Sequence, residues 1–205
     1  MFTLLIRVIR TWLAQLLTVA AIAMSTGCAV TGQDDASSPA DSVLAGRYEY
    51  AVEARQAGEM DVAEEAFDEL AIDYPALAEP RINLAILYID SDRPQEAETL
   101  LDRIVTAHPG NAVAWNELAI LRRRNGRLAA ADEAYVNAIE AEPDYALAHR
   151  NRGILLDLYL GQPREALDHY SRYLELSGSD EEVEGWVTEM SYRLGVEVAQ
   201  QVADR

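Results

Sequence analysis

Small residues and prolines recur along this chain at a fixed interval of 34 residues. Three series show it: Ala51, Ala85, Ala119 and Gly153; Ala63, Ala97 and Ala131; and Pro75, Pro109 and Pro143. An interval of this size, with small residues at set phases, is typical of stacked helix–turn–helix units. Such arrays bury their core between neighbouring repeats and present long surfaces to other proteins. The interval therefore predicts an all-α fold and an interaction role.

The composition excludes several function classes. The 205 residues include 35 acidic and 17 basic side chains, and the formal net charge is −18. This balance argues against nucleic acid as a partner, because the phosphate backbone would repel the chain. The chain has no phosphate-binding glycine loop and no motif of a serine or cysteine nucleophile. The sequence predicts neither an enzyme nor a cofactor.

The histidines do not form a metal-binding pattern. They are His108, His149 and His169. Zinc sites need clustered His, Cys or carboxylate ligands, and these three residues lack such spacing. Packing or surface positions are therefore expected for His108 and His149, and no metal site is predicted.

The N-terminal segment, residues 1–27, has the organisation of a signal peptide. Arg7 and Arg10 precede an apolar stretch over residues 13–24, and Ser25-Thr26-Gly27-Cys28 follows with the chain's single cysteine. This ending resembles the lipobox of bacterial lipoproteins, although that family prefers Leu where Ser25 stands. The resemblance implies cleavage after Gly27, a diacylglyceryl thioether on Cys28 and acylation of the new N-terminus. Ordinary cleavage after Ala23 and an uncleaved span are the alternatives.

The residues after the lipobox indicate location and a tether. Ala29 follows Cys28, where an inner-membrane retention signal of lipoproteins would usually have Asp. The resemblance therefore implies a lipid anchor in the outer membrane, facing the periplasm. Residues 28–43 lack apolar periodicity and are rich in Ser, Asp and Pro, so they are predicted to be a flexible tether.

The repeats divide the rest of the chain into 44–77, 78–111, 112–145 and 146–180. The third repeat carries the fullest set of landmarks: Trp115, Leu118, Ala119, Gly126, Ala131, Tyr135, Ala138 and Pro143. At these phases the chain resembles the tetratricopeptide repeat family. That resemblance implies a right-handed α-solenoid of four repeats over residues 44–180. Residues 181–205 are predicted to form a capping helix and a tail, because a terminal repeat has a hydrophobic face to cover.

The landmarks have predicted structural roles. Small residues of the first helix should lie against small residues of the second, and larger side chains should fill the gap between repeats: Phe67, Leu101, Tyr135 and Tyr170. Glycines should end first helices in a left-handed conformation: Gly58, Gly126 and Gly161. Trp186 belongs to an apolar stripe of the last helix, which favours a core position over a ligand platform. Arg47 and Arg81 stand where the third repeat has Trp115.

The same resemblance implies a concave groove lined by the first helices. Its predicted partner-binding residues are Tyr48, Ile82, Ile86, Asn116, Ile120, Arg123, Arg124, Arg150 and Ile154. The middle is aliphatic and one end is cationic, which suits a partner segment with hydrophobic anchors and an acidic group or C-terminal carboxylate. The alternative is that the arginines only pair with Glu117 or Asp157. The two-carboxylate clamp of chaperone-binding members is not reproduced.

These features together predict a membrane-anchored periplasmic scaffold that binds other proteins. Lipoproteins of this plan include type IV pilus pilotins, tight-adherence pilus factors, barrel-assembly lipoproteins and adaptors for cell-wall hydrolases. Pilus or secretion-system assembly is the leading expectation. An accessory of cell-wall or energy-transduction machinery is the second, and a self-associating structural module that forms a homo-oligomer is the third.

Overall fold

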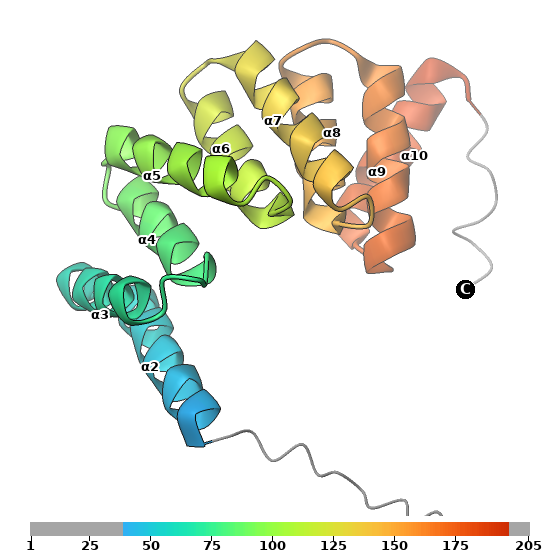
Figure 1. The fold of residues 1–205 in the computed structure, drawn as a ribbon. Helices are drawn as coiled ribbons and strands as arrows, with labels where there is room; N and C mark the ends of the chain where they lie inside the picture. The colour runs from blue at the N-terminus through green and yellow to red at the C-terminus, as the bar shows by residue number, and fades with distance from the viewer. Residues whose placement is uncertain (1–38, 197–205) are drawn as a thin grey trace, which may run out of the picture. The chain divides into compact units, whose positions relative to one another are not determined.

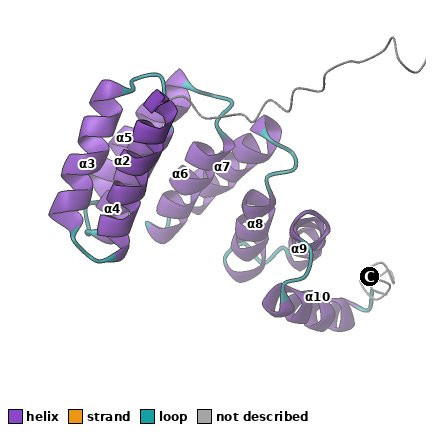
Figure 2. Cartoon of the chain, turned by 90° about the horizontal axis from the view of Figure 1, so that it is seen from below, coloured by secondary structure: helices purple, strands orange, loops and turns teal. Residues whose placement is uncertain are grey.

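The described part of the chain is entirely helical. The computed structural model describes residues 39–196, with side chains from residue 42 onward. Within this range nine α-helices are joined by short loops and no strand is present (Figure 1, Figure 2). The helices are α2 (Pro39–Gln56), α3 (Met60–Asp73), α4 (Glu79–Asp90), α5 (Pro94–Ala107), α6 (Ala112–Arg124), α7 (Leu128–Ala141), α8 (Ala146–Leu158), α9 (Pro163–Ser177) and α10 (Glu181–Leu194). The all-α class predicted from the sequence is confirmed.

Each predicted repeat contains one pair of helices. Second helices pack against the first helix of the next repeat, as α3 does on α4, α5 on α6 and α7 on α8. First helices also contact one another directly, α4 with α6 and α6 with α8. No second helix among the described residues makes a comparable contact with the second helix of the next repeat. The first helices therefore line the inner side of this array.

Small residues let the two helices of a repeat approach closely. Four first-helix positions and four second-helix positions are fully or almost fully buried, as the pattern predicts: Ala51, Ala85, Ala119, Gly153, Ala63, Ala97, Ala131 and Ala166. The larger side chains predicted between repeats are buried too: Phe67, Leu101, Tyr135 and Tyr170. At Gly153 a Cβ atom would lie 2.6 Å from Cε1 of Tyr170, so no side chain fits there without displacing that ring.

A recurring hydrogen bond ties each repeat to the one before it. Near the start of three first helices, a side chain donates to the carbonyl of the proline six residues earlier. The pairs are Arg81 with Pro75 (3.0 Å), Trp115 with Pro109 (2.9 Å) and His149 with Pro143 (3.0 Å). The three side chains differ in shape, but each supplies an N–H donor with the required reach. This shared role explains why Arg81 can stand at the phase of Trp115.

The turn between the helices of a repeat needs a left-handed residue. Gly58 and Gly126 have φ of 79° and 74° there, and Asp92, at the same phase in the second repeat, has φ of 57°. Asp92 is the one non-glycine residue with positive φ among the described residues. A side chain raises the energy of this conformation, although aspartate tolerates it better than most residues.

The last helix extends the repeat pattern. Helix α10 packs on α9, as each earlier first helix packs on the second helix before it. Arg193 pairs with Asp157 of α8 (3.4 Å), at the phases where Arg55 pairs with Asp90 between α2 and α4 (3.3 Å). Gly195 follows with φ of 64°, in the turn phase of Gly126. The predicted capping helix therefore occupies the position of the first helix of a fifth repeat.

The N-terminal boundary differs from the prediction. Helix α2 begins at Pro39, so residues 39–43 of the predicted tether are helical. Proline is well suited to a first helical position, because the N–H it lacks would have no partner inside the helix. The predicted signal segment and Cys28 lie outside the described residues. None of the described helices is long and apolar enough to cross a membrane.

The contact at Gly153 predicts that two Gly→Ala substitutions change the free energy of unfolding in opposite directions. Gly153→Ala should lower the free energy of unfolding by about 1–3 kcal/mol, because the new methyl group overlaps the buried Tyr170 ring. Gly46→Ala, in α2 with open space around its Cβ position, should raise it by up to about 1 kcal/mol. Urea unfolding followed by circular dichroism measures both. Equal shifts of the same sign would contradict the packing described.

The left-handed turn at Asp92 predicts opposite effects on stability for two substitutions at equivalent turn positions. Asp92→Gly should raise the free energy of unfolding by about 0.5 kcal/mol, since the relief of left-handed strain exceeds the entropy that glycine adds to the unfolded chain. Gly126→Ala, at the equivalent turn, should lower it by about 1 kcal/mol. Chemical denaturation of the two variants against the wild type tests this. A loss of stability in Asp92→Gly would show that the aspartate side chain itself stabilises the turn.

Candidate protein-interaction surface

The predicted partner-binding residues all lie on first helices, but two of them are not accessible. Ile82 is 3% exposed and belongs to the core between α4, α5 and α6. Asn116 is 1% exposed. The prediction that these two side chains line an open groove is therefore corrected. Arg124 is exposed and the remaining predicted residues are half-buried: Tyr48, Ile86, Ile120, Arg123, Arg150 and Ile154.

At the α2–α4 end the inner surface is internally paired. Asn83 donates a hydrogen bond to the Tyr48 hydroxyl. Arg55 forms its ion pair with Asp90 across the same two helices. Tyr48 also packs edge-on against Phe67, with ring centroids 5.9 Å apart. These contacts hold α2 on α3 and α4, so little of this end is left for a partner to bind by polar contacts.

The middle of the surface is more polar than the sequence suggested. Asn151 of α8 donates to Oδ1 of Asn116 (3.0 Å), and Nδ2 of Asn116 donates to Oε1 of Glu117 (3.1 Å). Burial raises the pKa of the Glu117 carboxyl, and the Asn116 hydrogen bond opposes this shift. Ile86, Ile120 and Ile154 pack against the cores beneath them. The aliphatic middle is thus mostly repeat packing.

Near the predicted groove the chain has a cationic cluster of six arginines: Arg122, Arg123, Arg124, Arg127, Arg150 and Arg152. Most of them brace neighbouring helices. Arg122 pairs with Asp102 (3.0 Å), and Arg127 pairs with Glu98 (2.5 Å), both acids being on α5. Arg152 pairs with Asp132 of α7, at 2.8 Å. These partners are neither of the two acids, Glu117 and Asp157, that the alternative prediction named.

Arg150 is engaged by the last helix. Its Nη2 lies 3.3 Å from Oε2 of Glu182, and its guanidinium carbon lies 5.5 Å from the centroid of the Trp186 ring. Trp186 itself lies against Tyr170, with centroids 5.3 Å apart, and packs on the core of the last repeat. Trp186 is half-buried, so it packs at the edge of this core and does not lie within it. Arg150 is therefore part of the contact between α8 and α10.

Arg123 and Arg124 are the members of the cluster that form no ion pair with any described residue. The Arg123 guanidinium carbon lies 5.6 Å from the centroid of the Tyr159 ring. Burial raises the pKa of the Tyr135 hydroxyl, and the neighbouring Arg123 guanidinium opposes that shift. Tyr159 was not among the predicted site residues. The fourth repeat is one residue longer than the others, at Leu158-Tyr159-Leu160-Gly161, and this insertion is the sequence signal that could have indicated Tyr159.

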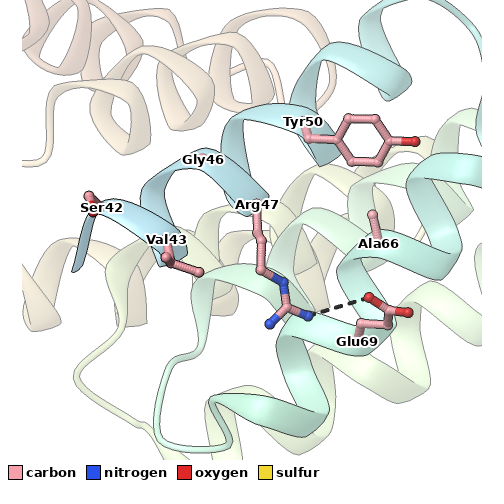
Figure 3. Close-up of a pocket in the computed structure, with 7 residues that line it drawn as sticks. All are labelled: Ser42, Val43, Gly46, Arg47, Tyr50, Ala66 and Glu69. Carbon is pink, nitrogen blue, oxygen red and sulfur yellow. Dashed lines mark hydrogen bonds and ion pairs between the residues drawn. The ribbon is translucent and has the colours of Figure 1, made fainter. Parts of the chain in front are cut away.

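A hollow of about 350 Å³ lies away from this surface, between α2 and α3 (Figure 3). Its lining residues are Ser42, Val43, Gly46, Arg47, Tyr50, Ala66 and Glu69. Arg47 points towards Glu69 in the close-up and pairs with it (3.4 Å) and with Asp73 (2.7 Å). Its one cation is thus already neutralised. No group of three or more His, Cys, Asp or Glu side chains placed to hold a metal ion occurs in residues 42–196.

Comparison with known proteins identifies the fold family. One family model described as a tetratricopeptide repeat matches residues 54–121, and a second with the same description matches residues 116–182. The chain belongs to the tetratricopeptide repeat family. The predicted family and solenoid class are thereby confirmed. Tetratricopeptide repeats are generally non-catalytic modules that bind other proteins, so an interaction scaffold is the coarse function of this chain.

A curated relative covers part of the chain. The uncharacterized protein y4yS of Sinorhizobium fredii (strain NBRC 101917 / NGR234) is 32% identical over 97 residues, which are 47% of this chain and 53% of that protein. The chain therefore spans about half the length of the curated relative it matches.

Solved structures show the same fold at low sequence identity. The structure of Pseudomonas aeruginosa pilF has a TM-score of 0.66 at 16% identity, over 76% of this chain and 70% of that one. A thermophilic tetratricopeptide repeat protein of Thermus thermophilus gives 0.60 at 20%, over 74% and 83%. The first such domain of Spaghetti (RPAP3), bound to an HSP90 peptide, gives 0.53 at 24%, over 58% and 95%. These likenesses concern the fold alone.

The fourth repeat contains a closed hydrogen-bond network of two histidines. His149 Nε2 donates to the Pro143 carbonyl, so its Nδ1 must accept from Nδ1 of His169, 3.0 Å away. His169 Nε2 then accepts from Arg152, at 3.1 Å. Each ring needs one N–H and one lone pair, so both imidazoles are neutral here. The residue types and the 34-residue interval gave no sign of this pairing.

The environment of the network disfavours protonation. Burial lowers the pKa of His169 to about 4, and the charge of Arg152 and the neighbouring His149 act in the same direction while Asp132 opposes them. Burial also lowers the pKa of His149, and nearby Arg172 and Arg152 contribute while the Pro143 hydrogen bond and Asp144 oppose them.

This network predicts a loss of stability in acid. Between about pH 6.5 and 4 the unfolded chain binds more protons at these rings than the folded chain, so stability falls as the pH falls through that window. His169→Gln should make the fall in the free energy of unfolding over this pH window smaller by about 1–2 kcal/mol, after allowance for solvent screening. Urea unfolding at several pH values measures it. His108→Gln is the control, and an equal change in its pH profile would rule out the network as the cause.

Proposed function

We propose that this chain is a lipid-anchored periplasmic scaffold that holds a segment of another protein along its first helices. The observation that carries the proposal is the inner surface itself. It runs across α4, α6 and α8 without interruption, and at its α6–α8 end it has two arginines, Arg123 and Arg124, with no ion pair in the described range. A continuous surface with unpaired charge suits a binding protein and offers no arrangement of nucleophile, base and oxyanion donor. We therefore propose no catalytic activity.

The membrane part of the proposal rests on the sequence. The signal segment and Ser25-Thr26-Gly27-Cys28 support acylation at Cys28, and Ala29 supports the outer membrane, facing the periplasm. Removal of residues 1–27 takes away Arg7 and Arg10, so the mature chain would be more acidic still. A chain so acidic would not be drawn electrostatically to an anionic lipid surface, so the acyl chains would have to supply the attachment.

Assembly of a pilus or secretion system is the pathway we propose. The lipobox-type segment and the repeat array support this pathway, because lipoproteins of this plan serve such machines.

Attachment at Cys28 predicts a defined N-terminus. Protein extracted from membranes should carry acyl groups on a mature N-terminal Cys28, and Cys28→Ala should appear in the soluble fraction or remain unprocessed. Mass spectrometry of the N-terminal peptide and fractionation of cells expressing both forms measure this. Circular dichroism of the variant is the control, because the repeats should keep the wild-type spectrum. A mature chain that begins at Met24 with a free thiol on Cys28 would remove the lipoprotein proposal.

A further inference from the structure

One end of the repeat array is open, on the face of α2 where a preceding second helix would pack. On α6 the corresponding face carries Leu118 and Leu121, which are buried in a core shared with α5. Two intervals of 34 residues earlier, α2 has Tyr50 and Glu53, and both are exposed. Tyr50 is 57% exposed, and Val43 on the same face is 58% exposed. Repeat arrays bury such faces against the neighbouring repeat, so this exposed face suits contact with another helix.

The hollow between α2 and α3 lies where such a helix would insert a large side chain (Figure 3). Between the first two repeats Phe67 takes the equivalent place, in a core with Leu84 and with Leu100 packed against it. One interval before Leu84 and Leu100 the chain has Tyr50 and Ala66, and both line the hollow. The hollow is thus the counterpart, at this end of the array, of the position that Phe67 occupies. We call it the α2–α3 socket and define it by four of its lining residues: Val43, Gly46, Tyr50 and Ala66.

The residues that precede α2 do not carry a large side chain for the socket. One interval before Phe67 the chain has Gln33, and residues 28–42 contain no aromatic residue, Leu, Ile or Met. The same phase in the four repeats holds Phe67, Leu101, Tyr135 and Tyr170. This step rests on the proposed cleavage after Gly27, which removes the apolar residues 1–27. The side chain that fits the socket must then come from another molecule.

The surface of α3 next to the socket is acidic. A second hollow, of about 460 Å³, is lined by Asp61, Glu64, Glu65, Asp68, Glu69 and Ile72. Glu64 and Glu69 pair with arginines of the chain. The other three carboxylates are exposed and form no ion pair with any described residue; we call them the α3 ridge: Asp61, Glu65 and Asp68. Their spacing places them on one stripe of the helix, so they favour a partner with basic side chains.

We propose that the α2–α3 socket and the α3 ridge dock a basic amphipathic helix of another protein. A helix is the occupant because a second helix fills the corresponding place before α4, α6, α8 and α10. Its large apolar side chain enters the socket, and Lys or Arg beside that side chain lie over the ridge, where opposite charge raises the association rate. A second copy of this chain is disfavoured, since its net charge of −18 repels it from an acidic surface. This interface lies outside the inner surface of the first helices and adds a second partner to the scaffold.

The test is a selection of displayed helical peptides, 14 residues long like α3, on the full-length protein purified from membranes in detergent micelles. The variant Gly46→Met should fill the socket. It should keep the wild-type circular dichroism spectrum and stability, because no atom lies within 4 Å of the Gly46 Cβ position. Peptides that prefer the wild type should bind Gly46→Met at least about tenfold more weakly. They should carry Phe, Tyr, Trp or Leu beside Lys or Arg, and peptides that bind both forms equally belong to other surfaces.

The α3 ridge provides a second arm of the test. The double variant Glu65→Gln, Asp68→Asn should bind a selected peptide about threefold to tenfold more weakly, and added salt should narrow this difference. The matched control is Glu133→Gln, Glu140→Gln, which removes two exposed charges from α7 and should leave the affinity unchanged. An equal loss of affinity in the control would show that net charge, and not the ridge, attracts the peptide.

Three results would overturn the proposal while leaving the inner-surface scaffold in place. The first is a selection in which every peptide binds Gly46→Met as well as the wild type. The second is a set of socket-dependent peptides without Lys or Arg. The third is self-association of the Cys28→Ala form in sedimentation experiments that Gly46→Met abolishes, since the occupant would then be a second copy of this chain.

Discussion

The close approach of two helices inside each repeat is the constraint on which the rest of this structure depends. It is possible because each first helix has alanine or glycine where the second helix crosses it, and the second helix has alanine facing it. The larger rings and leucines of the second helix then reach into the gap between repeats. At Gly153 the clearance is smaller than one methyl group, since a Cβ atom would lie 2.6 Å from the Tyr170 ring. A tightly closed pair has one way to stack, so the first helices are brought side by side.

The loops between repeats depend on a second constraint. The first helix that follows needs a side chain with an N–H donor at a set position, but the type of residue there can vary. Three of the loops between repeats present a proline carbonyl to a donor on the next helix, and arginine, tryptophan and histidine all meet that need. The choice then has local consequences. Trp115 contributes an indole to the neighbouring core. His149 instead joins His169 in the network that also holds Arg152 and Asp132. The fourth repeat thereby contains two neutral imidazoles, and its stability depends on pH.

The 34-residue interval was enough to predict the family, the helix pairs and the residues that pack between them. It works because helix length, turn length and crossing position all repeat with the backbone. The left-handed turn at Asp92 was not predicted. The interval does indicate it, because Asp92 lies 34 residues from both Gly58 and Gly126. It predicted α10 as a cap, and the Asp157–Arg193 pair and the turn at Gly195 add that this helix lies at the position of a fifth first helix. The start of α2 at Pro39 was missed because those residues have no apolar periodicity.

The interaction surface was predicted less well, for a physical reason. A repeat register predicts which positions face inward. It does not predict which side chains form hydrogen bonds or ion pairs with one another there. Ile82 and Asn116 have the right phase and are nevertheless buried, because neighbouring helices close over them. Arg122, Arg127 and Arg152 pair with acids from other repeats, and which acid each one reaches depends on side-chain geometry. Tyr159 comes from an insertion that the register treats as an irregularity.

The charge distribution connects this surface with the proposed anchor. Acidic side chains outnumber basic ones by about two to one, so the surface as a whole repels acidic segments at distances within the Debye length. The unpaired Arg123 and Arg124 make the charge positive over one small area of the inner surface, and salt should weaken both the repulsion and the attraction. A patch of this size gives modest affinity by itself. On the proposed tether it would meet partners that share the same membrane at a raised effective concentration, so that weak, exchangeable contacts suffice for a scaffold.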